Sequence, residues 1–211
     1  MSIVVDTFVM GPYRSNCYVL RSERGAEEAV VVDPGDDPTP VRLELARMGA
    51  RAAGVLVTHT DVDHIAGVAA LAEGTGSEVW APVGEVEALR TGETRGGLRV
   101  GAHDPAHTVT GGDEITVGGI TFEVLDVPGH SIGHVAFLVD DQLFSGDLLF
   151  EGSVGRVDLE GGDWDTLLDS VRSLLDRLSP DTVLYPGHGP TTTLGRELQT
   201  NPFLRELRAA Q

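Results

Sequence analysis

A short and almost entirely apolar segment at residues 54–58 (Gly-Val-Leu-Val-Thr) is the feature that most restricts the fold. A strand with one solvated face alternates polar and apolar residues, whereas this segment has no polar side chain before Thr58. Continuous apolar strands are typical of sheet centres that are covered on both faces. We therefore expect a layered α/β protein with residues 54–58 inside a sheet.

The other predicted elements follow the same plan in both halves of the chain: strands come first, and a helix and a further strand follow. We expect strands at residues 3–10, 17–21, 29–33, 54–58, 78–81, 114–117, 120–127, 134–139, 142–145 and 182–185. We expect helices at residues 40–48, 65–72, 83–89, 164–178 and 195–207, and a long surface loop at 91–105. This order fits one domain over residues 1–211, in which two sheets lie between layers of helices.

The net charge of the chain limits its partners. Asp and Glu number 33 against 15 Lys and Arg, which gives a formal net charge of −18. Such a surface repels phosphate backbones and anionic membranes. We expect a small-molecule substrate, with neither nucleic acid nor membrane as a partner; the sequence leaves the oligomeric state open.

The single cysteine, Cys17, cannot form an intramolecular disulfide, which favours a reducing compartment. The N-terminus lacks the pattern of a signal peptide, and no uncharged run approaches the ~20 residues that span a bilayer. We therefore expect a cytoplasmic enzyme. The chain contains neither a G-x-G-x-x-G nor a P-loop pattern, so we expect no nucleotide cofactor.

Histidines and aspartates recur in short turns that follow apolar strands. The first turn contains four of them within six residues, in the order His59, Asp61, Asp63 and His64. The later turns are Pro128-Gly129-His130 with His134, Gly146-Asp147, and Pro186-Gly187-His188. A lone loop histidine is usually a solvated side chain, but so many turns of one kind indicate a shared metal site.

These side chains suit a transition metal because imidazole nitrogen and carboxylate oxygen hold Zn²⁺, Fe²⁺ or Mn²⁺. Residues 59, 61 and 63 alternate, so in an extended segment their side chains project the same way. His64 points elsewhere unless the chain turns, and a strand running into a helix supplies that turn. One segment can thus serve two neighbouring metals, with Asp147 as a bridge, and paired metals activate water for hydrolysis.

The motifs closely resemble those of the metallo-β-lactamase superfamily, and within it the glyoxalase II-like (hydroxyacylglutathione hydrolase-like) hydrolases. The first motif of that family is H-x-H-x-D-H, and the turns around His130, Asp147 and His188 follow in the family's order. Asn16-Cys17-Tyr18 and the segment 155–163 also resemble that subgroup. The likeness spans about residues 7–203.

The resemblance implies an αββα sandwich, with two mixed sheets flanked by helices, and a dinuclear centre. Site one would consist of His59, Asp61, His130 and Asp147. Site two would consist of Asp63, His64, His188 and Asp147. A metal-bound hydroxide would attack a carbonyl group, and Asp63 would act as the catalytic residue that orients it.

Asp61 departs from the family pattern, which has a second histidine at that position. A carboxylate is harder and negatively charged, so it shifts the preference toward Fe or Mn relative to Zn, or weakens site one until a single ion remains. We therefore expect one or two ions, Zn²⁺ by family resemblance, with Fe or Mn as alternatives.

The leading functional hypothesis is a metallo-hydrolase for thioesters of the glyoxalase II type. The chain ends about 20 residues after His188 and lacks the basic C-terminal extension that binds glutathione in glyoxalase II, so the thiol carrier is open. The alternatives are a lactone or ester hydrolase of the same fold and a mononuclear-iron persulfide dioxygenase. That dioxygenase would use His59, His130 and Asp147. Nucleic-acid processing and a non-catalytic metal-binding module are less favoured.

The remaining notable residues have structural interpretations. We expect His134 to pack near the ligands, His103 and His107 to be surface loop histidines, and Cys17 to be a buried small side chain. Arg156 and Asp158 are expected to form an ion pair, and Tyr185 to pack in the core.

Overall fold

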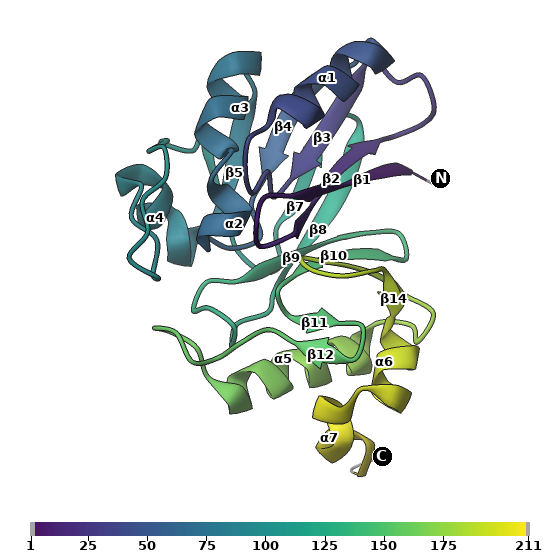
Figure 1. The fold of residues 1–211 in the computed structure, drawn as a ribbon. Coiled ribbons are helices and arrows are strands. Elements are labelled where there is room, and N and C mark those ends of the chain that lie inside the picture. The colour runs from purple at the N-terminus through teal and green to yellow at the C-terminus, as the bar shows by residue number, and fades with distance from the viewer. Residues whose placement is uncertain (1–2, 210–211) are drawn as a thin grey trace.

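The computed structural model describes residues 3–209; Met1, Ser2, Ala210 and Gln211, the ends of the expected 1–211 domain, lie outside the described residues. Two mixed six-stranded sheets form the centre of the fold (Figure 1). The first sheet has the order β1-β2-β3-β4-β5-β6, in which β1–β3 are antiparallel neighbours and β3–β6 are parallel neighbours. Its strands are β1 (Val4–Met10), β2 (Ser15–Arg21), β3 (Glu28–Val32), β4 (Arg51–Leu56), β5 (Glu78–Pro82) and β6 (His107–Val109).

The second sheet has the order β14-β13-β10-β9-β8-β7 and is antiparallel except between β10 and β13. Its strands are β7 (Glu114–Val117), β8 (Ile120–Asp126), β9 (Val135–Val139), β10 (Gln142–Gly146), β13 (Val183–Pro186) and β14 (Thr192–Thr193). A separate ribbon consists of β11 (Leu149–Phe150) and β12 (Ser153–Val154).

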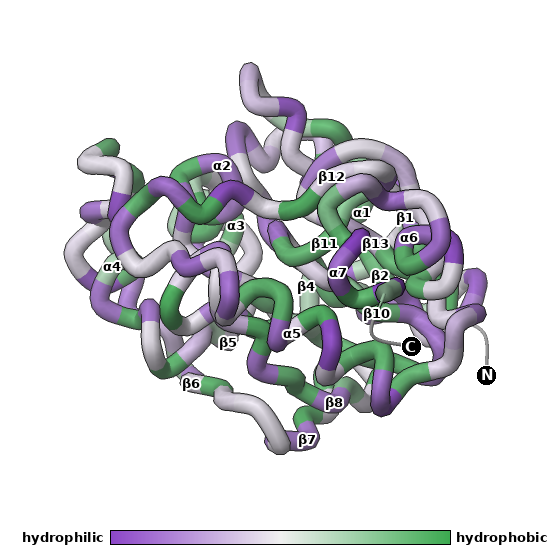
Figure 2. The backbone as a smooth tube through the Cα atoms, turned by 90° about the horizontal axis from the view of Figure 1, so that it is seen from below, coloured by the Kyte–Doolittle hydropathy of each residue, from purple (hydrophilic) through white to green (hydrophobic). Residues whose placement is uncertain are grey.

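Helices cover the outer faces of both sheets (Figure 1). Over the first sheet lie α1 (Thr39–Met48), α2 (Val62–Ile65), α3 (Val68–Thr75), the 3-10 turn η1 (Val83–Glu85) and α4 (Val86–Thr91). Over the second sheet lie α5 (Trp164–Arg177), α6 (Leu194–Thr200), η2 (Pro202–Leu204) and α7 (Arg205–Ala209). Figure 2 views the molecule from this second side, where hydrophobic and hydrophilic positions alternate along α5.

Three buried hydrophobic clusters fill the spaces between the four layers of the fold. The first joins the first sheet to α1 and α3, through residues such as Val31, Leu45 and Leu71. The second lies between the sheets and includes Leu56 and Phe137. The third joins the second sheet to the C-terminal helices. The expected αββα arrangement is confirmed.

Several predicted boundaries were wrong for local physical reasons. The helix expected at 65–72 is divided into α2 and α3, because Gly67 ends the first turn by donating its backbone N–H to the Pro34 carbonyl. Pro202 divides the helix expected at 195–207 into α6, η2 and α7. The strand expected at 54–58 begins earlier and ends at Leu56, and β6, β11, β12 and β14 were not predicted. The 91–105 segment is a loop beyond the end of α4, as expected, with one isolated bridge between Glu93 and Arg99.

Within residues 3–209, no helix combines the length and the apolar character needed to cross a bilayer.

Candidate metal centre

The turns that follow four strands meet in one place. His59 follows β4, His130 follows β8, Asp147 follows β10 and His188 follows β13. Because β4 lies in the first sheet and the others lie in the second, the cluster forms where the two sheets face each other. Strand ends are rigid supports for side chains that must hold a fixed geometry.

The first motif turns earlier than the alternation of its residues predicted. Asp61 is extended (φ −66°, ψ 147°) and precedes α2, but Asp63 and His64 already lie in that helical turn. The expected strand-like alternation of 59, 61 and 63 is therefore wrong at Asp63. The strand-to-helix turn instead sends Asp61 and the Asp63–His64 pair to two different groups of ligands.

All seven predicted ligands lie close together. The donor atoms of His59, Asp61 and His130 are within 4.8 Å of one another, and so are those of Asp63, His64 and His188.

Asp147 lies between the two groups. One of its oxygens is 3.3 Å from His64 Nε2, and the other is 3.7 Å from His130 Nε2 and 3.5 Å from His188 Nε2. This carboxylate thus has the position of a bridge between two adjacent sites.

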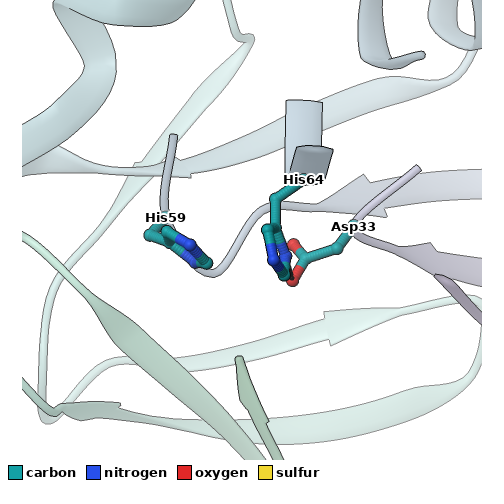
Figure 3. A group of neighbouring side chains, drawn as sticks. All are labelled: Asp33, His59 and His64. Atoms are coloured by element: carbon teal, nitrogen blue, oxygen red, sulfur yellow. Dashed lines mark hydrogen bonds and ion pairs between the residues drawn. The ribbon is translucent and has the colours of Figure 1, made fainter. Parts of the chain in front are cut away.

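Asp33, which sequence reasoning did not single out, orients two of the histidines. Its carboxylate accepts hydrogen bonds from Thr58 N (2.8 Å), Thr58 Oγ1 (2.6 Å) and His64 Nδ1 (3.0 Å). Since the Thr58 hydroxyl donates to Asp33, it is left to accept from His59 Nδ1 at 2.9 Å. Figure 3 shows Asp33 beside the His64 ring, with the His59 ring facing it; the two ring centroids are 4.1 Å apart.

These bonds fix which nitrogen each histidine presents to the centre. With Nδ1 of His59 and His64 acting as donors, both Nε2 atoms face inward. Asp33 also falls within a group of possible metal donors with His59 and His64. Both Asp33 oxygens already accept hydrogen bonds, so we interpret it as a support for the ligands and not as a ligand itself.

The unpaired atoms around site two fit a cation. His64 Nε2 and Asp147 Oδ1 are buried and lack a hydrogen-bond partner among the described residues. Burying this nitrogen and this oxygen 3.3 Å apart without hydrogen-bond partners costs folding free energy, unless a positive charge lies between or beside them. His59 Nε2 is unpaired in the same way. Imidazole and carboxylate donors of this kind suit Zn, Fe or Mn.

The pKa shifts report the same need for positive charge. Burial alone would lower the pKa of His188, but hydrogen bonds to Asp147 and Asp63 raise it to about 9. Burial would likewise lower the pKa of His64, and Asp147 and Asp33 raise it instead. The pKa of Asp147, which burial would raise, is lowered by His64 and His188. The carboxylates thus attract protons to these histidines, and a divalent ion would displace them.

Glu85, a second residue that sequence reasoning missed, ties two ligand-bearing loops together. Its buried carboxylate accepts from Thr60 N (2.6 Å) and Thr60 Oγ1 (2.8 Å), between His59 and Asp61. The other oxygen accepts from Gly133 N (3.1 Å) and from the Ser131 hydroxyl, just after His130. Nothing in the motif pattern indicates this role, since Glu85 lies in a helical turn that carries no ligand.

Arg95, the third missed residue, reaches site one from the 91–105 loop. Its guanidinium contacts both oxygens of Asp61, at 2.5 Å from Nε and 2.7 Å from a terminal nitrogen. The same terminal nitrogen is 2.8 Å from His130 Nε2. Burial alone would raise the pKa of Asp61, but the hydrogen bonds that Arg95 donates, together with the nearby His59 and His130, lower it.

The other residues discussed from the sequence have structural surroundings. His134 is buried against His59 (ring centroids 4.8 Å apart), and burial and His130 lower its pKa to about 3. His107 is at the surface but begins β6 and stacks on Trp80, so its placement in a loop was wrong. Arg156 pairs with Asp158 at 2.7 Å, and Cys17 is fully buried.

A cavity of about 350 Å³ opens onto the centre. Both aspartates of the first motif reach its wall, and so do His130, Asp147 and His188. The cavity is also lined by Tyr13, Val62, Thr94, Gly96, Leu98, Arg156 and Leu159. A polar cluster at one end of a partly apolar cleft is a common form of small-molecule site.

Fold and centre together define a metallo-hydrolase type of protein, in which His and Asp side chains gather where two sheets meet. The chain belongs to the metallo-beta-lactamase superfamily, whose profile matches residues 10–188. The family binds divalent metals, and the cluster described above is placed to do so. The hydroxyacylglutathione hydrolase GloC of Haemophilus influenzae is 31% identical over 95% of this chain and 97% of its own length.

Two solved structures are similar over nearly the whole chain. The B3 metallo-beta-lactamase BLEG-1 has a TM-score of 0.88 and 35% identity, over 96% of this chain and 100% of its own. TTHA1623 in a di-iron-bound form has a TM-score of 0.83 and 39% identity, over 95% and 100%. One neighbour is described as a lactamase and the other by its two iron ions, so they support the class of protein and leave the substrate and the metal open.

Proposed function

We propose that this protein is a metal-dependent hydrolase of thioesters of the glyoxalase II type. The similarity to a hydroxyacylglutathione hydrolase over 95% of the chain supports this reaction. The observation that carries the proposal is the cavity, which is lined both by His and Asp residues of the centre and by apolar side chains. Such a cavity can hold a carbonyl group at the centre and an acyl chain against Val62, Leu98 and Leu159.

We propose that Asp63, His64, His188 and Asp147 form one metal site, and that His59, Asp61 and His130, with Asp147, form the other. When bound, a metal ion supplies a water of lowered pKa and a Lewis acid for the carbonyl oxygen.

Asp63 is proposed as the catalytic carboxylate. It lines the cavity, and one of its oxygens is 3.2 Å from His188 Nε2, which fixes its orientation. A carboxylate at this position can accept a hydrogen bond from the attacking water and so direct it toward a carbonyl carbon.

The cavity also bears on the thiol carrier. Among the described residues that line it, Arg156 is the only Lys or Arg, and its guanidinium already pairs with Asp158. Glutathione carries two carboxylates, and the chain as a whole has a net charge of −18. We therefore propose that thioesters of uncharged thiols are accepted at least as well as those of glutathione.

The test is a substrate panel run on protein of measured metal content. S-acyl glutathiones, S-acyl N-acetylcysteamines, lactones, simple esters and a β-lactam would be compared. We expect thioester hydrolysis that is lost with chelator and in a His188→Ala variant. A His107→Ala variant is the matched control, because His107 lies at the surface against Trp80. A metal-loaded protein that hydrolyses only lactones, or none of the panel, would refute the proposal.

A persulfide dioxygenase is the alternative from another reaction class. It would hold a single iron through His59, His130 and Asp147, but His130 Nε2 is engaged by Arg95 at 2.8 Å. That contact weighs against an ion held by these residues alone, whereas a hydrolase can also use the site of Asp63, His64, His188 and Asp147. Oxygen consumption with a persulfide substrate would support the dioxygenase over the hydrolase.

A further inference from the structure

Arg95 occupies the place where an ion at site one would meet its ligands. Of the three donors grouped there, Asp61 and His130 both contact its guanidinium, and His59 Nε2 stays unpaired. Two backbone hydrogen bonds order the loop on either side of Arg95: Thr94 N donates to the Leu98 carbonyl (3.0 Å), and Gly97 N donates to the Thr94 carbonyl (2.8 Å). The loop thus forms a tight turn with Arg95 at its tip.

The guanidinium has no donor left for a substrate. Nε donates to Asp61, and one terminal nitrogen donates to Asp61 and to His130 Nε2. The other terminal nitrogen contacts the backbone carbonyls of His130 and Glu160, the latter at 3.4 Å. Arginine has five N–H bonds, and each therefore has an acceptor here. This saturation indicates a role toward the site itself and not toward a bound ligand.

His130 presents to Arg95 the same nitrogen, Nε2, that it would present to a metal ion. His130 Nδ1 is 2.8 Å from the Arg156 carbonyl, which can only accept, so Nδ1 carries the proton. His130 Nε2 then carries a lone pair, which accepts a hydrogen bond from Arg95. An ion at site one would need this lone pair and at least one Asp61 oxygen, so ion and guanidinium exclude each other.

Among residues 3–209, no arginine or lysine contacts the donors of site two in this way. His188 Nε2 is 3.2 Å from Asp63 and 3.5 Å from Asp147, and His64 Nε2 has no hydrogen-bond partner among the described residues. The donors of site two thus contact only one another, while those of site one are held by a permanent positive charge.

We propose that Arg95 is a built-in counter-charge for site one, so that the protein binds one divalent ion tightly at site two. A second ion enters site one only when Arg95 withdraws. The inference goes beyond the proposed function, because it concerns metal occupancy and holds whichever substrate is hydrolysed.

The test is a titration of chelator-treated protein with Zn²⁺ and, separately, Mn²⁺, followed by calorimetry and by elemental analysis after dialysis. We expect one tightly bound ion per wild-type chain. In an Arg95→Gln variant we expect the second ion to bind roughly 10- to 100-fold more tightly, an effect equal in size to the loss that follows mutation of residues that contact metal ligands. Arg156→Gln is the matched control: it removes the same charge from a residue that lines the cavity at the centre, but its guanidinium contacts Asp158 and not the ligands.

Two results would overturn the inference. One is a wild-type protein that binds two ions with equal affinity, a measurement that needs no variant. The other is a folded Arg95→Gln protein in which the second ion binds no more tightly than in Arg156→Gln. Substrate turnover enters neither measurement, so failure here is distinct from failure of the thioesterase proposal.

Discussion

Glu85 offers a test of how the centre is held, because its carboxylate is hydrogen-bonded to two different loops. One loop contains Thr60, and the other contains Ser131 and Gly133. In a Glu85→Gln variant one of the two oxygens becomes an amide nitrogen. The Ser131 and Thr60 hydroxyls can rotate to suit it, but the backbone N–H groups of Thr60 and Gly133 cannot. Whichever way the amide is turned, a buried backbone N–H faces a donor.

The cost follows from these contacts. A buried N–H without an acceptor and the loss of charge from the remaining bonds together destabilise the fold by about 3 kcal/mol. For a chain of this length that corresponds to a fall of roughly 6–12 °C in the midpoint of thermal unfolding. The ions should also bind more weakly, since Thr60 lies between His59 and Asp61.

Circular dichroism during heating, with and without metal, measures the effect. Glu87→Gln is the matched control, since Glu87 is exposed two residues further on and the charge change is the same. We expect that control to remain within about 0.5 kcal/mol of wild type. Equal unfolding midpoints for the two variants would show that the Glu85 bonds do not hold the loops.

Three further variants test other parts of the centre. Asp33→Asn removes a hydrogen-bond acceptor from His64 and Thr58, so we expect the metal affinity measured by calorimetry to fall roughly 10- to 100-fold. The control is Asp181→Asn at an exposed position. An unchanged affinity would count against the role of Asp33 as a support. Gly187→Ala would place a methyl group against Asp147 Oδ1 and 2.6 Å from His64 Cε1, whereas Gly96→Ala meets nothing within 4 Å. We expect the first to lose about 1–3 kcal/mol of unfolding free energy together with metal affinity, and the second to lose neither; equal behaviour would contradict the packing argument. The single variant Asp61→His should be less stable than the double variant Asp61→His, Arg95→Gln, because the single change leaves a partly buried guanidinium without its carboxylate. If the changes in unfolding free energy of the two substitutions simply add, Asp61 and Arg95 are not coupled.

The layers of the fold were predictable because they depend on patterns that are local in sequence. Continuous apolar runs such as 54–58 indicated buried strands, and Gly118-Gly119 indicated the turn between β7 and β8, where both glycines have positive φ. Short edge strands such as β6 and β14 have too few residues to show a period. They form because a neighbouring strand offers free backbone groups, which is a tertiary effect.

The grouping of these His and Asp residues was predictable for a different reason: they are chemically distinctive and lie next to strand ends. The supporting residues were not predictable in this way. Glu85 and Arg95 are ordinary helix and loop residues in the sequence. The hydrogen-bond partners of Glu85 are 25 to 48 positions away, and those of Arg95 are 34 to 65 positions away. Asp33 was easier to recognise, since it directly follows β3 and precedes Pro34-Gly35.

The Asp61 departure was itself the one sequence signal for Arg95. Replacing the family's neutral histidine by aspartate adds one negative charge to a centre that already contains Asp33, Asp63 and Asp147. A partly buried carboxylate is stable only with a partner, and Arg95 supplies one that contacts both oxygens. Asp61 and Arg95 together carry no net charge, so the rest of the centre keeps the charge it would have with histidine at position 61. The departure at Asp61 therefore changes the number of ions that the centre can hold without changing the charge that surrounds site two, and the two residues are best understood as one unit.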